Sequence, residues 1–100
     1  MSKYLGDFAA GDTIDFKFTT FRPSTGAAYT LAGTPAISIY KDNSTTESTA
    51  GITLTTDFDS RTGLNHVRLT TSSDGTFYAD GSQFEAVITA GTVDSVSVVG

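Results

Sequence analysis

Apolar and polar side chains alternate through most of residues 13–21 of this chain, and this period of two constrains the fold more than any other feature. Ile14, Phe16 and Phe18 share one parity, and Asp15 and Lys17 lie between them. An extended strand sends successive side chains to opposite faces, so the segment is predicted to be a half-buried β-strand. The alternation recurs in further segments bounded by turn-forming residues: 36–41, 52–56, 65–70, 84–90 and 93–99.

The amino-acid composition favours the same class of fold. Ser and Thr make up 29 of the 100 residues, 18 of them Thr, whereas the chain has two Glu, one Gln and three Lys. Thr is β-branched and suits a pleated surface with one face in water, and strong helix formers are scarce. A hydrophobic fraction of 38% supplies one core, with Phe as its main bulk. We therefore predict a single domain over residues 1–100.

Clusters of Gly, Pro and small polar residues mark the connections between these strands. Residues 22–26, 42–46 and 57–63 are predicted to turn the chain, residues 29–31 to form a short edge strand, and a short helical turn is expected between Asp74 and Ala79. Val67 and Leu69 are predicted to share an inner face with Asn65. About seven short strands in such a chain predict an all-β fold, an immunoglobulin-like antiparallel β-sandwich. A small barrel is the alternative.

Both ends of the chain carry apolar residues that a solvated tail would not need. Tyr4, Leu5 and Phe8 lie in a leader, residues 1–11, that we expect to pack on the domain or to act as an interface arm. The alternation of residues 93–99 is expected to form a last strand whose edge is unguarded. The interface candidates at this end are Val96, Val98 and Val99.

The charge of the chain argues against several classes of partner. The formal net charge is −5, the pI is about 4.4, and the six basic residues do not cluster, so nucleic acid is not expected as a partner. No apolar run reaches the roughly 20 residues that span a bilayer, and no secretory signal is present, so we expect no membrane partner and synthesis in the cytosol. Isolated glycines form no phosphate-binding loop, and no cofactor is expected.

The sequence contains no specific constellation for catalysis. The single histidine, His66, lies on a predicted strand near Asn65 and Arg68. Nucleophilic hydrolysis needs a nucleophile, a base and an orienting group within reach of one another, and 29 hydroxyl residues make no partner of His66 specific. We expect no catalytic site and interpret His66 as a surface or partner-facing side chain.

Loop carboxylates and tyrosines provide two weaker kinds of candidate site. Asp57 and Asp59 are the candidates for calcium, with Asp74 and Asp80 contributing if their loops meet. Loop aspartates usually cap turns, and neither an EF-hand spacing nor a Cys or His pair for zinc occurs, so no metal is expected. The candidates for an exposed aromatic face that binds glycan are Tyr29, Tyr40 and Tyr78.

Four stretches, MSKYLGDFAAGDT, IYKDNSTT, DFDS and DGTFYA, resemble small tailed-bacteriophage proteins with an immunoglobulin-like fold. The likeness covers nearly the whole chain. Gly11-Asp12-Thr13 before the first strand and the Gly81 to Phe84 entry to a late strand are also similar to the N-terminal immunoglobulin-like domain of phage baseplate proteins. The resemblance implies a virion component of the tail, baseplate or fibre region and brings no catalytic residues.

This resemblance also implies a role and partners. We expect a non-enzymatic virion structural protein, made in the bacterial cytoplasm, that assembles through sheet edges and end loops with other virion proteins and with itself. A displayed module for a host-surface receptor or glycan, and a capsid decoration protein, are the alternatives. The compared proteins continue into a stretch like Phe-Ser-Ile-Glu, whereas this sequence stops at Val98-Val99-Gly100. We therefore expect a truncated chain or an edge completed by another subunit.

Overall fold

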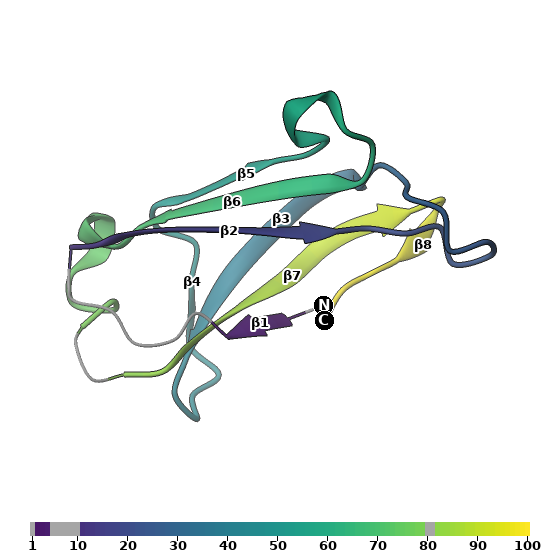
Figure 1. The fold of residues 1–100 in the computed structure, drawn as a ribbon. Coiled ribbons are helices and arrows are strands. Elements are labelled where there is room, and N and C mark those ends of the chain that lie inside the picture. The colour runs from purple at the N-terminus through teal and green to yellow at the C-terminus, as the bar shows by residue number, and fades with distance from the viewer. Residues whose placement is uncertain (1, 5–10, 80–81) are drawn as a thin grey trace.

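The computed structural model describes residues 2–4, 11–79 and 82–100 and places them in two antiparallel sheets that pack as a sandwich (Figure 1). The predicted all-β sandwich is thereby confirmed. The strands are β1 (Ser2–Tyr4), β2 (Thr13–Thr19), β3 (Ala32–Lys41), β4 (Glu47–Ser48), β5 (Ile52–Thr55), β6 (Leu64–Thr70), β7 (Phe84–Val93) and β8 (Val96–Ser97). Two short 3-10 turns are η1 (Phe58–Ser60) and η2 (Thr71–Asp74). Neither these turns nor anything else in the described ranges forms a helix that could span a membrane.

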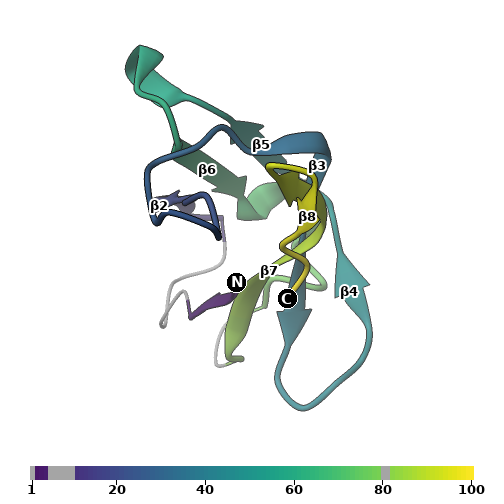
Figure 2. The ribbon, with the colours of Figure 1, turned by 90° about the vertical axis from the view of Figure 1, so that its right-hand side faces the viewer.

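The strand order matches the immunoglobulin arrangement. One sheet has the order β1-β7-β3-β4, with β8 also paired to β7, and the other has the order β2-β6-β5. Figure 2 shows the two layers end on. We assign β2 and β3 to strands B and C, and β5, β6, β7 and β8 to strands D, E, F and G. With this assignment the two sheets contain the immunoglobulin orders B-E-D and C-F-G. A strand A would extend the first of these beside B, but β1 pairs with β7 in the other sheet instead.

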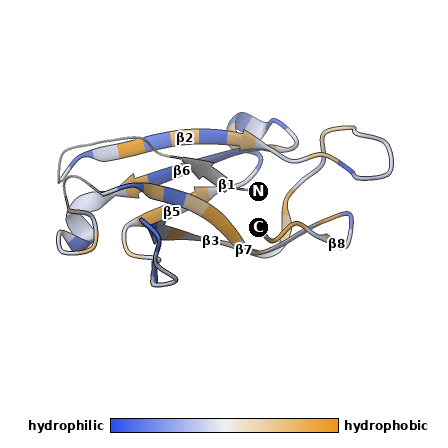
Figure 3. Cartoon of the chain, turned by 90° about the horizontal axis from the view of Figure 1, so that it is seen from below, coloured by the Kyte–Doolittle hydropathy of each residue, from blue (hydrophilic) through white to orange (hydrophobic). Residues whose placement is uncertain are grey.

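The core lies between the sheets, where the alternation places it. Ile14, Phe16 and Phe18 of β2 are half-buried and the residues between them are exposed, so the opening prediction is confirmed (Figure 3). Burying one large apolar side chain fully contributes roughly 1.5–3 kcal/mol. The buried cluster consists of alternate residues of β3, β6 and β7 and one tyrosine from the loop before β7: Ile37, Ile39, Val67, Leu69, Tyr78, Phe84, Ala86 and Ile88.

Asn65 is buried on the inner face of β6, as predicted, and connects β6 to the loop that follows β2. Its Nδ2 donates to Gly63 O at 3.3 Å and to Thr20 Oγ1 at 3.4 Å. The Thr20 hydroxyl donates in turn to Tyr29 O at 2.7 Å. Buried polar groups cost free energy unless they are paired, so this network favours one path for the chain between β2 and β3.

The last strand, β8, is shorter than the strand predicted over residues 93–99, and it begins three residues later. β7 continues through Val93, and Asp94 and Ser95 turn the chain back with φ of 50° and 64°. Val93 pairs with Val96 across this two-residue loop, the geometry of a tight hairpin with positive φ at both central positions. Asn-Gly or Asp-Gly is the usual signal for such a loop, and its absence here hid the turn.

The last strand lies along an edge of β7, and no described strand pairs with its own outer edge. Beyond β8, the N–H groups of Val98 and Gly100 donate to Gly91 O at 3.2 Å and to Ile88 O at 3.0 Å. Residues 96–100 therefore line the same edge of β7 that β1 joins at residues 85–87. Figure 1 shows β1 and the segment that follows β8 on the same side of β7.

Three further boundaries differ from the predictions. Residues 29–31 form no strand, and β3 begins at Ala32 and passes through a register shift near Pro35. The strand predicted over residues 52–56 is β5, which pairs with β6, and a further short strand, β4, precedes it and pairs with β3 in the other sheet. The helical turn expected between Asp74 and Ala79 lies slightly earlier, in η2.

Candidate functional site

The longest strand at a sheet edge is β2, with seven residues. At the other edges β1 has three residues, β4 and β8 have two each, and β5 has four. Natural sheets blunt their edges with very short strands, because a long row of unpaired N–H and C=O groups is a template for another chain. In the part of the chain that the structure describes, no strand pairs with the outer edge of β2. We take this edge as the centre of the candidate site.

Hydrogen bonds at both ends of β2 indicate which backbone groups face outward. The Thr20 N–H donates to Gly63 O at 2.9 Å, and the Thr71 N–H donates to Asp12 O at 3.2 Å. Both bonds continue the β2–β6 ladder, so the even-numbered residues of β2 direct their backbone groups to β6. The odd-numbered residues direct theirs to the open edge: Thr13, Asp15, Lys17 and Thr19.

An apolar groove of about 260 Å³ lies beside the end of β2. Its lining comes from both sheets: Thr19, Thr20, Phe21, Ile88, Val93 and Val98. Phe21 is 54% exposed, and Val96 and Val99, the sequence neighbours of this lining, are 49% and 57% exposed. We call the groove, with its exposed lining residue Phe21, the lateral surface. Exposed apolar surface of this kind marks a site of association when it is contiguous.

The interface residues predicted from the sequence are found only partly at this surface. Val98 lines the groove, whereas Val96 and Val99 are exposed and are not among its lining residues. Tyr4 belongs to β1 and pairs with a residue of β7. The predictions for Leu5 and Phe8 lie outside the described residues.

Phe21 was missed by the sequence reasoning, which placed it with the core aromatics. One signal identifies it. Its odd number gives it the parity of Asp15 and Lys17 rather than that of the half-buried residues of β2. An aromatic on the polar parity of a strand is a candidate for an exposed contact residue.

The outer face of β2 and β6 carries the Asp15 cluster, which consists of Asp15, Lys17, Phe58, His66 and Arg68. Arg68 Nε and Nη2 donate to the two carboxylate oxygens of Asp15 at 2.8 and 3.1 Å. His66 Nε2 lies 3.0 Å from Asp15 Oδ1. The Phe58 ring stacks on His66 with 5.0 Å between ring centroids, and Lys17 Nζ lies 4.6 Å from the Phe58 centroid.

The Asp15 cluster keeps its carboxylate ionised. The hydrogen bonds from Arg68 lower the pKa of Asp15 from 3.8 to about 2, desolvation opposes them, and the hydrogen bond with His66 adds to the lowering. The same contact raises the pKa of Arg68. Asp15 is therefore a fixed negative charge at the edge of β2 at any pH near neutrality.

Asp15 and His66 have the contact of an orienting carboxylate and a base, but the third member of a hydrolytic triad is not beside them. His66 Nε2 contacts Asp15, and His66 Nδ1 is buried and has no hydrogen-bond partner among the described residues. Neither ring nitrogen contacts a hydroxyl there. The arrangement fixes the position of the ring, and none of the described residues is placed to act as a nucleophile beside it.

The calcium candidates are engaged within their own loop. Asp57 accepts the Gly63 N–H through Oδ1 at 2.9 Å and the Thr30 hydroxyl through Oδ2 at 2.8 Å. Asp59 is exposed and lies 3.5 Å from Arg61 Nε. The described residues contain no group of three or more potential metal-ligating side chains. Asp57 thus has the turn-capping role that loop aspartates usually have.

The three tyrosines proposed for glycan binding do not share a face. Tyr78 is fully buried and its pKa is raised by desolvation, so its assignment as a glycan contact is wrong. Tyr40 donates to Glu47 Oε2 at 2.7 Å, which raises the pKa of Tyr40 and lowers that of Glu47. Tyr29 is half-buried beneath Arg22, whose guanidinium carbon lies 4.5 Å from the ring centroid.

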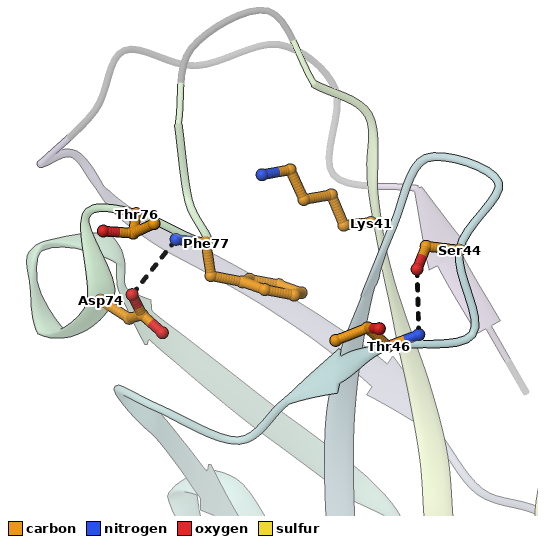
Figure 4. A pocket seen from close by; sticks show the side chains of 6 residues that line it. All are labelled: Lys41, Ser44, Thr46, Asp74, Thr76 and Phe77. Carbon is orange, nitrogen blue, oxygen red and sulfur yellow. Dashed lines mark hydrogen bonds between the residues drawn. The ribbon is translucent and has the colours of Figure 1, made fainter.

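A polar pocket of about 380 Å³ opens where the β3–β4 loop meets η2 (Figure 4). Lys41 Nζ lies 5.6 Å from the centroid of the Phe77 ring, and Asp74 Oδ1 accepts the Phe77 N–H at 3.1 Å. Asp74 thus caps its own turn, and Asp80 lies outside the described residues. No signal in the sequence indicated this pocket, because its walls come from loops distant in the chain. The lining is Lys41, Ser44, Thr46, Asp74, Thr76 and Phe77.

Comparison of the chain with protein-family models, with curated proteins and with solved structures found no match.

Proposed function

We propose that this chain is a non-enzymatic structural protein of a tailed-bacteriophage particle, located in its tail, baseplate or fibre region, and that it assembles there through sheet edges. The observation that carries the assembly role is the open seven-residue edge of β2 next to the lateral surface. The phage context is supported by the sequence resemblance. A capsid decoration role would use the same surface.

The physical argument for assembly combines two kinds of contact. An open edge offers main-chain hydrogen bonds to an added strand, and a groove beside it offers a pocket for side chains. Phe21, Val96 and Val99 place large apolar side chains in water, and burying them against a neighbour is favourable by about 25 cal/mol per Å² of apolar area. A protein partner satisfies both features at once.

Particle composition tests this proposal. Phage carrying the wild-type gene, Phe21→Asp or the control Thr62→Asp are purified, and the protein is quantified by mass spectrometry. Thr62 is exposed in the loop before β6 and receives the same charge. We expect wild type and Thr62→Asp at one fixed copy number and a large loss of Phe21→Asp. Absence of wild-type protein from particles would contradict the virion role, and equal incorporation of Phe21→Asp would contradict the lateral surface.

Glycan binding is the second candidate function, and one observation favours it. A groove of about 300 Å³ is lined by Tyr40 together with Asp42 and Asn43. Ligand sites combine such an aromatic wall with a few polar groups that fix orientation. On a glycan array, Tyr40→Ala should abolish any retention seen with wild type. Unchanged retention would eliminate this site.

A further inference from the structure

The sequence of β2 complements itself when it is reversed. Read from Thr13 to Thr19 it is TIDFKFT, so a second antiparallel copy centred on Phe16 places Asp15 opposite Lys17 on both sides. We propose that two copies of this chain pair edge to edge through β2, which joins their β2-β6-β5 sheets into one continuous sheet. This inference rests on the proposed assembly role and names the partner, the edge and the register.

The backbone of β2 limits the registers that such a pair can adopt. Odd-numbered residues direct their N–H and C=O groups outward, so an antiparallel partner forms its bonds only where odd-numbered residues oppose odd-numbered residues. A shift by one residue would also set the polar face of one copy against the apolar face of the other. Registers centred on Asp15, Phe16 or Lys17 satisfy this condition.

Charge selects one of these three registers. A register centred on Asp15 places the two Asp15 carboxylates opposite each other, and a register centred on Lys17 does the same with the two Lys17 ammonium groups. Like charges in a directly opposed cross-strand pair are destabilising. Centring on Phe16 opposes Asp15 to Lys17 twice. This register also pairs all seven residues of β2, whereas the other two leave residues at the ends unpaired.

Both faces of the joined sheet gain contacts in this register. On the outer face, Arg68, Asp15 and Lys17 of the second copy form a row of alternating charge, because Asp15 already accepts from Arg68 on its other side. On the inner face, Ile14 lies opposite Phe18 of the second copy. Both side chains are only half-buried in one copy, so pairing removes further apolar surface from water.

A second copy fits this edge better than an unrelated strand. An unrelated partner would have to supply, in order, an acidic and a basic residue at the positions that face Lys17 and Asp15. The chain itself supplies them, with apolar residues at the correct parity between them. The edges formed by β1, β4 and β8 are too short to offer an equivalent ladder.

Analytical ultracentrifugation of charge variants tests the proposal. In a pair of identical copies, Lys17→Asp places an acidic residue opposite Asp15 at both positions. Asp15→Lys places a basic residue opposite Lys17 at both positions. We expect each variant alone to dissociate roughly 10-fold or more readily than wild type, since two attractive cross-strand pairs become repulsive. An equimolar mixture should recover dimer, because the two variants complement each other. The control Arg61→Asp changes the same charge at an exposed side chain in the loop before β6 and should dimerise like wild type.

Amide hydrogen exchange of the wild-type protein tests independently which backbone N–H groups of β2 lie at the interface between two copies. The amides of Asp15 and Lys17 should become protected as concentration rises, while those of Phe16 and Phe18 are protected at every concentration by β6. This measurement holds even if Asp15→Lys fails to fold. Protection that does not depend on concentration at Asp15 and Lys17 would overturn the proposal.

The outcomes separate this inference from the proposed function. A wild-type protein that remains monomeric up to millimolar concentration, or folded variants that show no recovery on mixing, would overturn the β2 pair and leave a virion role untouched. A dimer with the expected mixing behaviour whose protein is absent from purified particles would support the β2 pair and contradict the virion role.

Discussion

At the scale of single residues, Asp15 has the most contacts that bear on function. It accepts two hydrogen bonds from Arg68, contacts His66, and directs its own backbone groups to the open edge. Asp15 therefore belongs to the side-chain cluster on the outer face and also to the backbone edge where a second copy is proposed to bind. The alternation in the sequence predicted that Asp15, His66 and Arg68 face outward. It did not predict their contact, because the β2–β6 register depends on tertiary pairing.

Replacing Arg68 with Met should raise the pKa of Asp15 from about 2 towards its ordinary value of 3.8, because the principal hydrogen bonds to the carboxylate are lost. A carbon-detected NMR titration at low protein concentration measures this value directly. In wild type, the contribution of Asp15 to stability is complete above pH 3.8 and is lost as the pH falls towards 2. The control Arg61→Met should leave the titration unchanged. A wild-type midpoint near 3.8 would contradict this account.

Tyr78→Phe should lower the free energy of unfolding by about 1–2 kcal/mol, because a partly buried hydrogen bond is lost. The Tyr78 hydroxyl donates to Ala50 O at 2.9 Å. Tyr40→Phe is the matched control, since it removes an exposed bond to Glu47 and should change stability by less than about 0.5 kcal/mol. Urea denaturation measures both, and equal costs would show that Tyr78 is not the buried anchor described here.

At the scale of the elements, the turn before β6 depends on a close approach of backbone. Gly63 has a φ of +81°, and a Cβ there would lie 2.7 Å from Thr20 O. Gly26 has a similar φ of +74° with nothing within 4 Å of its Cβ position. Gly26→Ala should therefore cost only the left-handed strain, about 1 kcal/mol. Gly63→Ala should cost roughly 1–3 kcal/mol more, because of the added clash. Thermal or urea unfolding that ranks the two variants equally would refute this reading.

The sequence predicted the strands that keep a strict alternation and failed where the chain changes sheet. β2 and β6 lie where expected, with Val67 and Leu69 on the inner face. The strand predicted over residues 52–56 was found as β5, whereas β4, just before it, was not predicted and belongs to the other sheet. A period of two identifies the faces of a strand and carries no information on which sheet it joins.

At the scale of the whole molecule, the path of β1 decides which edge stays open. Because β1 and residues 96–100 both join β7, that edge is covered over most of its length. Because β1 pairs with β7 and not with β2, β2 is an edge strand of its own sheet. Among the described strands, the last strand β8 is an edge strand of only two residues, and the longer open edge lies at β2, the segment whose alternation first indicated the fold.

The lateral surface could not be predicted for a related reason. Its groove combines Phe21 with Ile88 and Val98, residues far apart in the sequence that meet only when the two sheets pack. The charge pattern of β2, in contrast, is local and readable in seven residues. What the sequence could not supply is that this strand lies at an edge and presents its odd-numbered residues outward.

Disulfide trapping tests the central claim, the antiparallel β2 pair centred on Phe16, most directly. The chain has no cysteine, so Thr13→Cys and Thr19→Cys introduce single thiols at positions that oppose each other only between copies in this register. We predict rapid cross-linking when the two variants are mixed under mild oxidation, and little when either is oxidised alone. Equal cross-linking in all three samples, or none in the mixture at concentrations where wild type is dimeric, would contradict the proposed pair.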